Sequence, residues 1–126
     1  MDGANSPGGA AVAGGCLFCK IVAGEIPCDE VYSDEDVFAF RDINPAAPTH
    51  ILIIPKKHIS FMPDAEPEDE ALMGKLLLKA NEIAEREGLS DDGFRYVINT
   101  RGHGGQTVHH VHLHILGGRQ MVWPPG

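Results

Sequence analysis

The chain has 126 residues, of which 43% are hydrophobic, and a formal net charge of −8. This length is typical of one globular domain, and the acidic balance argues against binding to a nucleic-acid backbone, which needs clustered Lys and Arg. No apolar run approaches the roughly 20 residues of a membrane-spanning helix. We therefore expect neither nucleic acid nor membrane as a partner, although backbone N–H groups and imidazoles can still hold one nucleotide phosphate.

Residues 1–15 are mostly Gly, Ala, Ser and Pro, which predicts a disordered tail ahead of a domain over residues 16–126. This stretch has neither the basic nor the hydrophobic region of a secretory signal. The cysteines number three, which is odd and too few for a secreted disulfide scaffold. We expect a protein of a reducing compartment, the cytoplasm and in addition the nucleus.

The first elements expected after the tail are a short helix and a hairpin. The helix begins at Cys16 and ends at Gly24. Val31–Tyr32 and Val37–Arg41 are typical of two strands, and the polar residues between them predict a turn. Ile51–Ile54 is a continuous apolar run, which indicates a central strand buried on both faces.

The second half of the chain is expected to hold one long helix and two strands. Apolar residues at helical spacing predict the helix over Glu68–Glu87. A strand at Phe94–Asn99, a glycine-rich loop and a strand around residues 110–116 follow. Consecutive strands with short links favour an antiparallel sheet of about five strands, with one long and one short helix, in an α+β domain.

Histidines alternate with apolar residues near the C-terminal end, where His110, His112 and His114 are interleaved with Val111 and Leu113. This is the period of a strand, so the imidazoles would share one face. Three imidazoles do not improve packing, which points to chemistry. Surface histidines on an edge strand are the plain alternative. A three-histidine metal site is another, but a metal on the central histidine would block it as a nucleophile.

The central histidine, His112, is the best candidate for a nucleophile, because its neighbours can contact the oxygens or the leaving group of a phosphoryl substrate. Gly104 and Gly105 precede this strand and allow backbone N–H groups to approach an anion. Gln106 and Thr107 add polar contacts. The segment therefore predicts a site for a phosphate ester or amide.

Several motifs together resemble one known family. His110–Leu116 is similar to the histidine triad motif, His-x-His-x-His with apolar residues between. Pro48–His58, Gly104–Thr107 and the ending Gly117–Gly126, which closes on Trp-Pro-Pro-Gly, resemble the Hint branch of that family, the histidine triad nucleotide-binding proteins. The resemblance extends from about Cys16 to the C-terminus.

The resemblance implies a homodimeric purine nucleoside phosphoramidase with a HIT-like fold, whose sheet continues across the dimer. The enzyme would hydrolyse the P–N bond of adenosine or guanosine 5′-phosphoramidates to the 5′-monophosphate, and it would need no catalytic metal. His112 would form a nucleotidyl-histidine intermediate, and His110, His114 and Thr107 would support the phosphate and the proton transfers.

The resemblance also implies a set of nucleotide contacts. Asp42 matches an acid that binds the ribose hydroxyls, and Trp123 matches a tryptophan that reaches the partner's active site. The full set is Phe18, Phe40, Asp42, Ile43, Asn99, Gly105, Gln106, Thr107, His112, His114 and Trp123. Each also has a plainer interpretation: Asp42 as a turn residue, the phenylalanines as core and Trp123 as a tail residue.

The pair Cys16 and Cys19 has the spacing of two zinc ligands. His50 and His110 are the candidates for the other two ligands, because their strands could converge with the Cys-bearing segment. Some members of the resembled family bind zinc through such a pair. The zinc would be structural and would leave the nucleophile free. The alternative is two buried reduced thiols, and a redox pair is less favoured without a βαβ pattern; Cys28 is expected to be a free thiol.

Two further functions stay open. One is a zinc-binding or nucleotide-sensing regulatory protein that acts through partners. The other is a different branch of the superfamily, a dinucleoside polyphosphate hydrolase or a nucleotidyltransferase; the transferases tend to carry Gln at the position of His114. For the homodimer, we expect the strand at Phe94–Asn99 and the long helix, whose apolar face Met73 and Leu77 widen, to form the contact.

Overall fold

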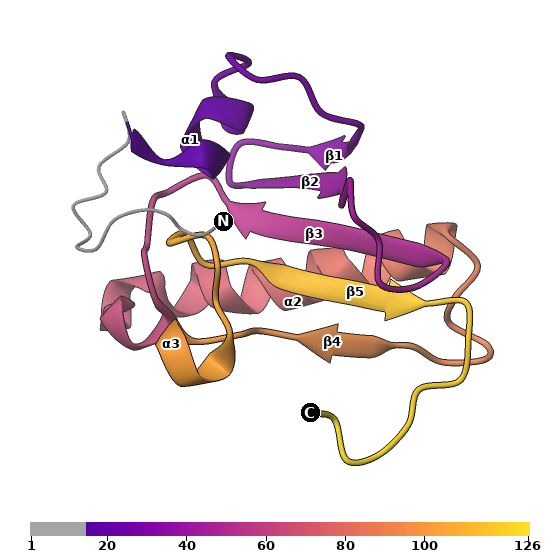
Figure 1. Ribbon diagram of the computed structural model, residues 1–126. Helices are drawn as coiled ribbons and strands as arrows, with labels where there is room; N and C mark the ends of the chain where they lie inside the picture. Colours follow the sequence, from indigo (N-terminus) through magenta and orange to yellow (C-terminus); the bar gives the residue numbers. More distant parts are fainter. Residues whose placement is uncertain (1–14) are drawn as a thin grey trace.

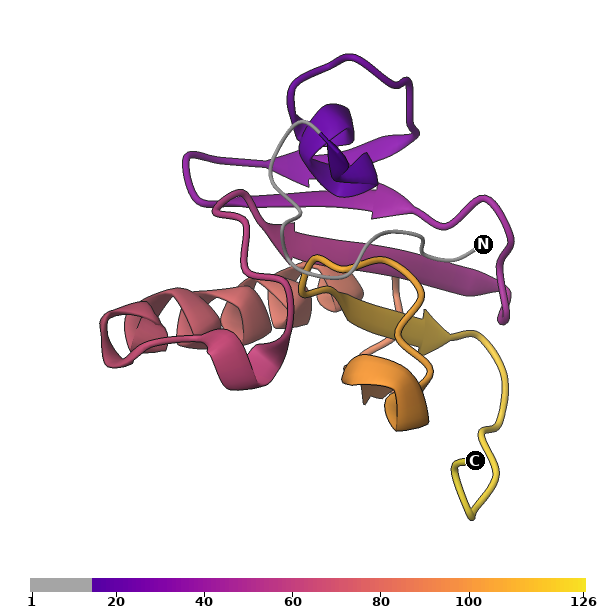
Figure 2. The same cartoon turned by 60° about the vertical axis from the view of Figure 1, so that its left-hand side comes forward.

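The computed structural model describes residues 15–126, so the predicted tail lies outside the described residues except for Gly15. A five-stranded antiparallel sheet in the order β1-β2-β3-β5-β4 forms the centre of the domain. The long helix α2 covers one face, and the short helix α1 lies against the other (Figure 1 and Figure 2). The helices and strands are α1 Leu17–Val22, β1 Glu30–Ser33, β2 Val37–Arg41, β3 Thr49–Pro55, α2 Glu70–Arg86, β4 Arg95–Val97, α3 Arg101–Gly104 and β5 Leu113–Gly117.

Both faces of the sheet are covered, because successive side chains of β2 and β3 point to opposite sides. On the α2 side, a larger core includes Ile51 and Ile53 with Leu76 and Ile83 of the helix. On the α1 side, a smaller core joins Phe18, Phe38, Phe40, Leu52 and Ile54. The predicted α+β class and the doubly buried central strand are confirmed.

Helix α2 is fixed at both ends by local chemistry. A 3₁₀ turn over Pro67–Asp69 precedes it, where Glu66 and Asp69 form a capping box. Gly88 follows the helix with a φ of +77°, a conformation that glycine adopts without strain. The predicted start at Glu68 and end at Glu87 therefore agree closely with the helix observed. No helix among residues 15–126 has the length and apolar character needed to cross a membrane.

The predicted histidine strand is only partly a strand. β5 begins at Leu113, which pairs with Ile53 of β3, so His114 lies in the sheet while His110 and His112 precede it. The chain leaves the ladder here because the N–H of Val111 donates to the carbonyl of Ile59, at 2.7 Å, and not to β3. Two smaller corrections concern β4, which is shorter than predicted, and the glycine-rich loop, which contains the short helix α3.

Candidate functional site

Five of the seven described histidines gather in two clusters on either side of the start of β5. The first, called the catalytic cluster below, contains Asp42, His50, His112 and His114. The second, called the Cys–His cluster, contains Cys16, Cys19, His58 and His110. Because His110 and His112 are two residues apart, one short segment of backbone connects the clusters.

His112 is buried and has one ring nitrogen assigned by its surroundings. Its Nδ1 lies 2.7 Å from the carbonyl oxygen of His110, which can only accept, so Nδ1 carries the proton and donates. In the neutral ring this leaves the lone pair on Nε2. Burial lowers the pKa of His112, against the opposing effect of the hydrogen bond to His110. His112 is therefore a neutral imidazole with a free Nε2 at neutral pH, as a nucleophile requires.

His50 and His114 form a chain of hydrogen bonds whose direction the backbone sets. The N–H of Ala46 donates to Nδ1 of His50 at 2.9 Å, so the proton of His50 resides on Nε2. Nε2 of His50 lies 2.9 Å from Nδ1 of His114 and donates to it. The proton of His114 is therefore on its Nε2, a buried atom without a hydrogen-bond partner among residues 15–126. Such an unpaired N–H is available to a ligand.

Asp42 lies beside this chain of hydrogen bonds and also stabilises a turn. Its Oδ2 lies 3.5 Å from Nε2 of His50, and its Oδ1 accepts from the N–H of Asn44 at 2.8 Å. The plain interpretation of Asp42 as a turn residue is thus correct, and the same carboxylate borders the catalytic cluster. Burial, together with His112 and His50, lowers the pKa of His114 to about 4 while Asp42 opposes that shift. Without ligand, His114 is neutral.

The structure brings some of the other predicted residues to this cluster and leaves others apart. Phe18 is core, as its plainer interpretation held, and its ring also packs edge-on against His112 at a centroid distance of 5.1 Å. Phe40 is core against Phe18, at 5.4 Å. Ile43 and Trp123 are 87% and 80% exposed, so neither packs against the rest of residues 15–126.

The glycine-rich loop is held by Gln106. Its amide donates to the carbonyls of Ser60 and Val108, at 2.8 and 3.0 Å, and accepts from the N–H of Arg101 at 2.9 Å. The buried Gln106 side chain is therefore engaged with the protein. Gly105 adopts a φ of +81° as the cap of α3, and the exposed Thr107 follows. Asn99, which precedes α3, is partly buried.

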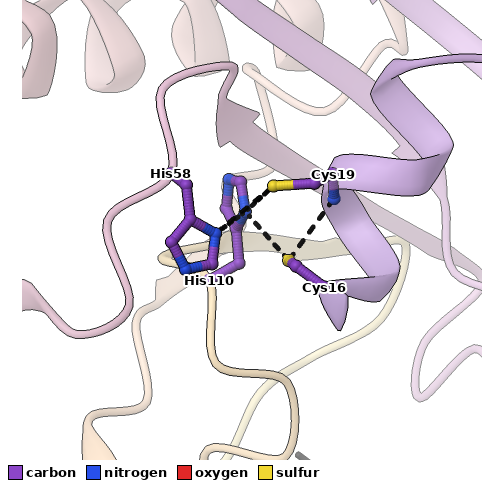
Figure 3. Close-up of side chains that lie close together, drawn as sticks. All are labelled: Cys16, Cys19, His58 and His110. Atoms are coloured by element: carbon purple, nitrogen blue, oxygen red, sulfur yellow. Dashed lines mark hydrogen bonds between the residues drawn. The ribbon is translucent and has the colours of Figure 1, made fainter. Parts of the chain in front are cut away.

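The Cys–His cluster differs from the predicted ligand set by one residue. His58 lies beside the cysteines (Figure 3), whereas the predicted His50 lies in the catalytic cluster. The antiparallel register explains this correction, because His50 pairs with Leu116 at one end of β3 and His110 lies near Pro55 at the other. His58 follows that second end by three residues. Working out the strand register would have identified His58 from the sequence.

Four of the six distances among the candidate ligand atoms are close to those around a tetrahedral zinc ion, and all four atoms lie within 4.8 Å of one another. The Cys16 sulfur lies 3.4 Å from Nδ1 of His110, and the Cys19 sulfur lies 3.3 Å from Nδ1 of His58 and 3.7 Å from Nδ1 of His110. The two Nδ1 atoms are 3.2 Å apart. Zn–S bonds of about 2.3 Å and Zn–N bonds of about 2.05 Å give S–N edges of about 3.5 Å and an N–N edge of about 3.3 Å.

The outer contacts of the cluster also suit a metal. Nε2 of His110 donates to the carbonyl of Pro55 at 2.8 Å, which leaves Nδ1 bare toward the sulfurs. Nε2 of His58 lies 3.0 Å from the Ser60 hydroxyl. Burial lowers the pKa of His110 to about 4, and burial together with Cys16 raises the pKa of Cys19 to about 12. Without metal, both groups are neutral, and a metal would have to displace the thiol proton.

An antiparallel α+β domain with a neutral, buried imidazole and an adjacent unpaired N–H defines a class of protein suited to histidine-dependent phosphoryl chemistry. A family model described as the HIT domain matches residues 23–121. The chain belongs to the HIT family.

Its relatives include proteins of several bacteria. The crystal structure of a HIT family hydrolase from Legionella pneumophila superposes with a TM-score of 0.87 and 56% identity, covering 88% of this chain and 99% of that one. An uncharacterised HIT-like protein of Synechococcus elongatus is 54% identical over 87% of this chain and 96% of its own length. The purine nucleoside phosphoramidase of Escherichia coli is 51% identical over 83% of this chain and 88% of its own. These relatives support a hydrolase of the HIT family.

Proposed function

We propose that this protein hydrolyses purine nucleoside 5′-phosphoramidates through a nucleotidyl intermediate on His112. The observation that carries the proposal is the fixed proton of His112, whose Nδ1 donates to the His110 carbonyl at 2.7 Å and leaves Nε2 free to attack. Similarity to the Escherichia coli purine nucleoside phosphoramidase supports the choice of substrate class.

In the first step, Nε2 of His112 bonds to phosphorus as the P–N bond breaks. The departing amine needs a proton, and His114 supplies it from Nε2. The negative charge of the bound substrate favours the protonated form of His114, which takes up a proton from solvent. This proton enters on Nδ1 of His114, so the hydrogen bond from Nε2 of His50, 2.9 Å away, must break, because two N–H groups repel each other. The carboxylate of Asp42, which lies within 4.8 Å of the ring nitrogens, would then accept from Nδ1 of His114.

In the second step, water attacks the phosphorus and the bond to His112 breaks. After the first step Nε2 of His114 is bare, so it accepts the proton that water loses. The products are the nucleoside 5′-monophosphate and the amine, and the imidazoles return to their starting protonation after one proton leaves to solvent. No catalytic metal enters either step, because the nucleophile is free as the neutral imidazole.

The nucleotide would lie across the catalytic cluster, with its phosphate near Nε2 of His114. Glycine N–H groups around Gly105 and the hydroxyl of Thr107 would contact the phosphate, with Asn99 nearby, and the carboxylate of Asp42 would accept from the ribose hydroxyls. The base would lie beside the exposed Ile43 side chain. The amide of Gln106 would act indirectly, by holding the phosphate loop.

We further propose that the Cys–His cluster holds a structural zinc ion through Cys16, Cys19, His58 and His110. The closeness of the four donor atoms, with four of their six distances near those of a tetrahedral zinc site, supports this assignment. Such an ion, when bound, would fix the conformation without taking part in hydrolysis. It would bind His110 alone among the triad histidines, so Nε2 of His112 would stay free.

A homodimer remains part of the proposal. β4 is an edge strand and its Tyr96 is exposed, and Leu77 and Leu78 of α2 also expose apolar surface of the sort that a second copy would cover. A dimer would also provide a neighbouring surface for the exposed Trp123. Sedimentation or light scattering that gives a monomeric mass would contradict this part.

The function is tested by comparing adenosine phosphoramidates, diadenosine polyphosphates and nucleotide sugars as substrates. We expect release of AMP mainly from the phosphoramidates, and an inactive His112→Ala variant. His103→Ala is the matched control, because His103 is exposed on α3. Stable nucleotide binding with no turnover of any substrate would favour the alternative of a nucleotide-sensing regulatory protein.

A further inference from the structure

We propose that the Cys–His cluster positions the nucleophile: when the cluster holds a metal, it fixes both the backbone that orients His112 and the helix that packs against it. Cys19 and His58 would then be positioning residues for hydrolysis, although neither touches the substrate. The inference rests on the proposed zinc site and on the proposed role of His112.

The nucleophile lies outside the sheet and needs another support. Ladder pairing of β5 with β3 begins at Leu113, so the backbone of His112 is not held by it. The preceding segment is held by separate contacts and not by a ladder: the N–H of Val111 donates to Ile59 at 2.7 Å, the N–H of His110 to Val108 at 2.9 Å, and the ring of His110 to Pro55 at 2.8 Å. A segment outside the ladder opens more readily than a strand interior.

His110 links the two clusters, one through its ring and the other through its backbone carbonyl. Its ring enters the Cys–His cluster, while its carbonyl accepts from Nδ1 of His112 at 2.7 Å. The same carbonyl determines which nitrogen of His112 is free to attack. A shift of the His110 ring therefore moves the group that sets the protonation of the nucleophile.

Helix α1 makes the second link. It carries Cys19 and Phe18, and Cys16 caps it. The ring of Phe18 packs against His112 at 5.1 Å and against His110 at 5.9 Å. A helix of six residues is not stable alone, so its position depends on its buried side chains and on whatever binds its cysteines.

Metal loss would loosen this arrangement without unfolding it. Apart from a metal, the contacts that the cluster offers are the thiol of Cys16 to His110 at 3.4 Å and the thiol of Cys19 to His58 at 3.3 Å. An S–H group is a weak donor, so these contacts restrain the rings less than metal bonds do. The larger core between α2 and the sheet contains none of the four residues. We therefore expect a folded protein with a less ordered nucleophile.

The test compares Cys19→Ser and His58→Gln with the matched controls Cys28→Ser and His103→Gln, and includes wild-type protein stripped by a chelator and reloaded with zinc. Cys28 and His103 lie outside both clusters. Metal content, kcat and KM, amide hydrogen exchange, and the tautomer of His112 from ring ¹⁵N NMR shifts are measured on each protein.

We expect the two cluster variants and the stripped protein to lose kcat by about 10- to 100-fold, the effect of a misplaced reacting group, with a smaller change in KM. Amide hydrogen exchange should rise over residues 108–113 and in α1 but not in α2 or β3. Reloading with zinc should reverse both the loss of kcat and the rise in exchange. Zinc loss with unchanged exchange and an unchanged His112 tautomer would overturn the proposal, as would a rise in exchange throughout the fold.

These outcomes are separable from failure of the proposed function. If no phosphoramidate is hydrolysed, exchange and the His112 tautomer still show whether the cluster positions His112. If the wild-type protein binds no zinc, the positioning role is wrong, whereas turnover that depends on His112 would still support the phosphoramidase.

Discussion

The two clusters hold the same side chain, histidine, in opposite tautomers, and the difference lies in which ring nitrogen donates to the backbone. In the Cys–His cluster, the Nε2–H of His110 donates to the Pro55 carbonyl, which leaves Nδ1 facing the sulfurs. In the catalytic cluster, the Nδ1–H of His112 donates to the His110 carbonyl, which leaves Nε2 free. His110 is therefore suited to metal binding and His112 to attack on phosphorus, because in each case one backbone carbonyl selects the tautomer of the ring.

The largest expected effect tests the attacking side of this comparison. His112→Ala should lower phosphoramidase activity by about 10⁴-fold or more, because it removes the nucleophile and not merely a contact. Steady-state kinetics on an adenosine phosphoramidate measures it, with circular dichroism to show that the variant folds. If the variant keeps a tenth of the wild-type rate, His112 is not the nucleophile.

The second prediction tests the metal-binding side. Elemental analysis should find about one zinc per wild-type chain, and almost none after His58→Ala. His50→Ala should keep its zinc, because His50 lies in the other cluster. If His50→Ala loses zinc and His58→Ala retains it, the ligand set first predicted from the sequence is correct and the assignment of the clusters fails.

A third prediction concerns the hydrogen bond from His50 to His114. His50→Ala should lower kcat by roughly 10- to 100-fold, because Nδ1 of His114 no longer accepts from His50, and that hydrogen bond keeps the proton of His114 on Nε2, where it can be donated. The loss should be larger for alkylamine leaving groups than for less basic arylamines, which need less protonation. An equal loss for both would mean that His50 acts on binding and not on the proton transfer.

The smallest effect is on stability in acid. Burial holds the pKa of His114 at about 4 in the folded protein, below the ordinary histidine value of 6.5, with His112, His50 and Asp42 facing the ring. The unfolded chain therefore binds the proton first, so the contribution of His114 to stability is present above pH 6.5 and is lost as the pH falls toward 4. Urea unfolding at pH 7.5 and 5 should show a smaller loss for His114→Gln than for the wild type.

The sequence predicted the fold better than it predicted the site. Apolar periodicity located α2 and β3, because burial imposes those patterns directly. The alternation of histidines suggested one continuous strand, yet His110 and His112 leave the ladder. Alternating residues record which side chains are buried, but not whether the backbone finds its partner in β3 or in the carbonyl of Ile59.

The proposed zinc ligands show a similar limit. Residue types and the spacing of the two cysteines indicated a metal site, but the choice between His50 and His58 depends on the register of β3 against β5. The unpaired N–H of His114 could not be predicted either, because it follows from the contact between Ala46 and His50. Such backbone contacts depend on the folded loop and leave no periodic signal.

Attack of Nε2 of His112 on phosphorus would leave an adenylyl group on that nitrogen. Rapid acid-free quenching of the wild-type enzyme with an adenosine phosphoramidate, followed by peptide mass spectrometry at neutral to alkaline pH, detects such a group. We expect an adenylyl group on His112 that forms and decays within the time of one turnover. Its absence from His112 during turnover, or a comparable adduct on His110 or His114, would show that His112 is not the nucleophile.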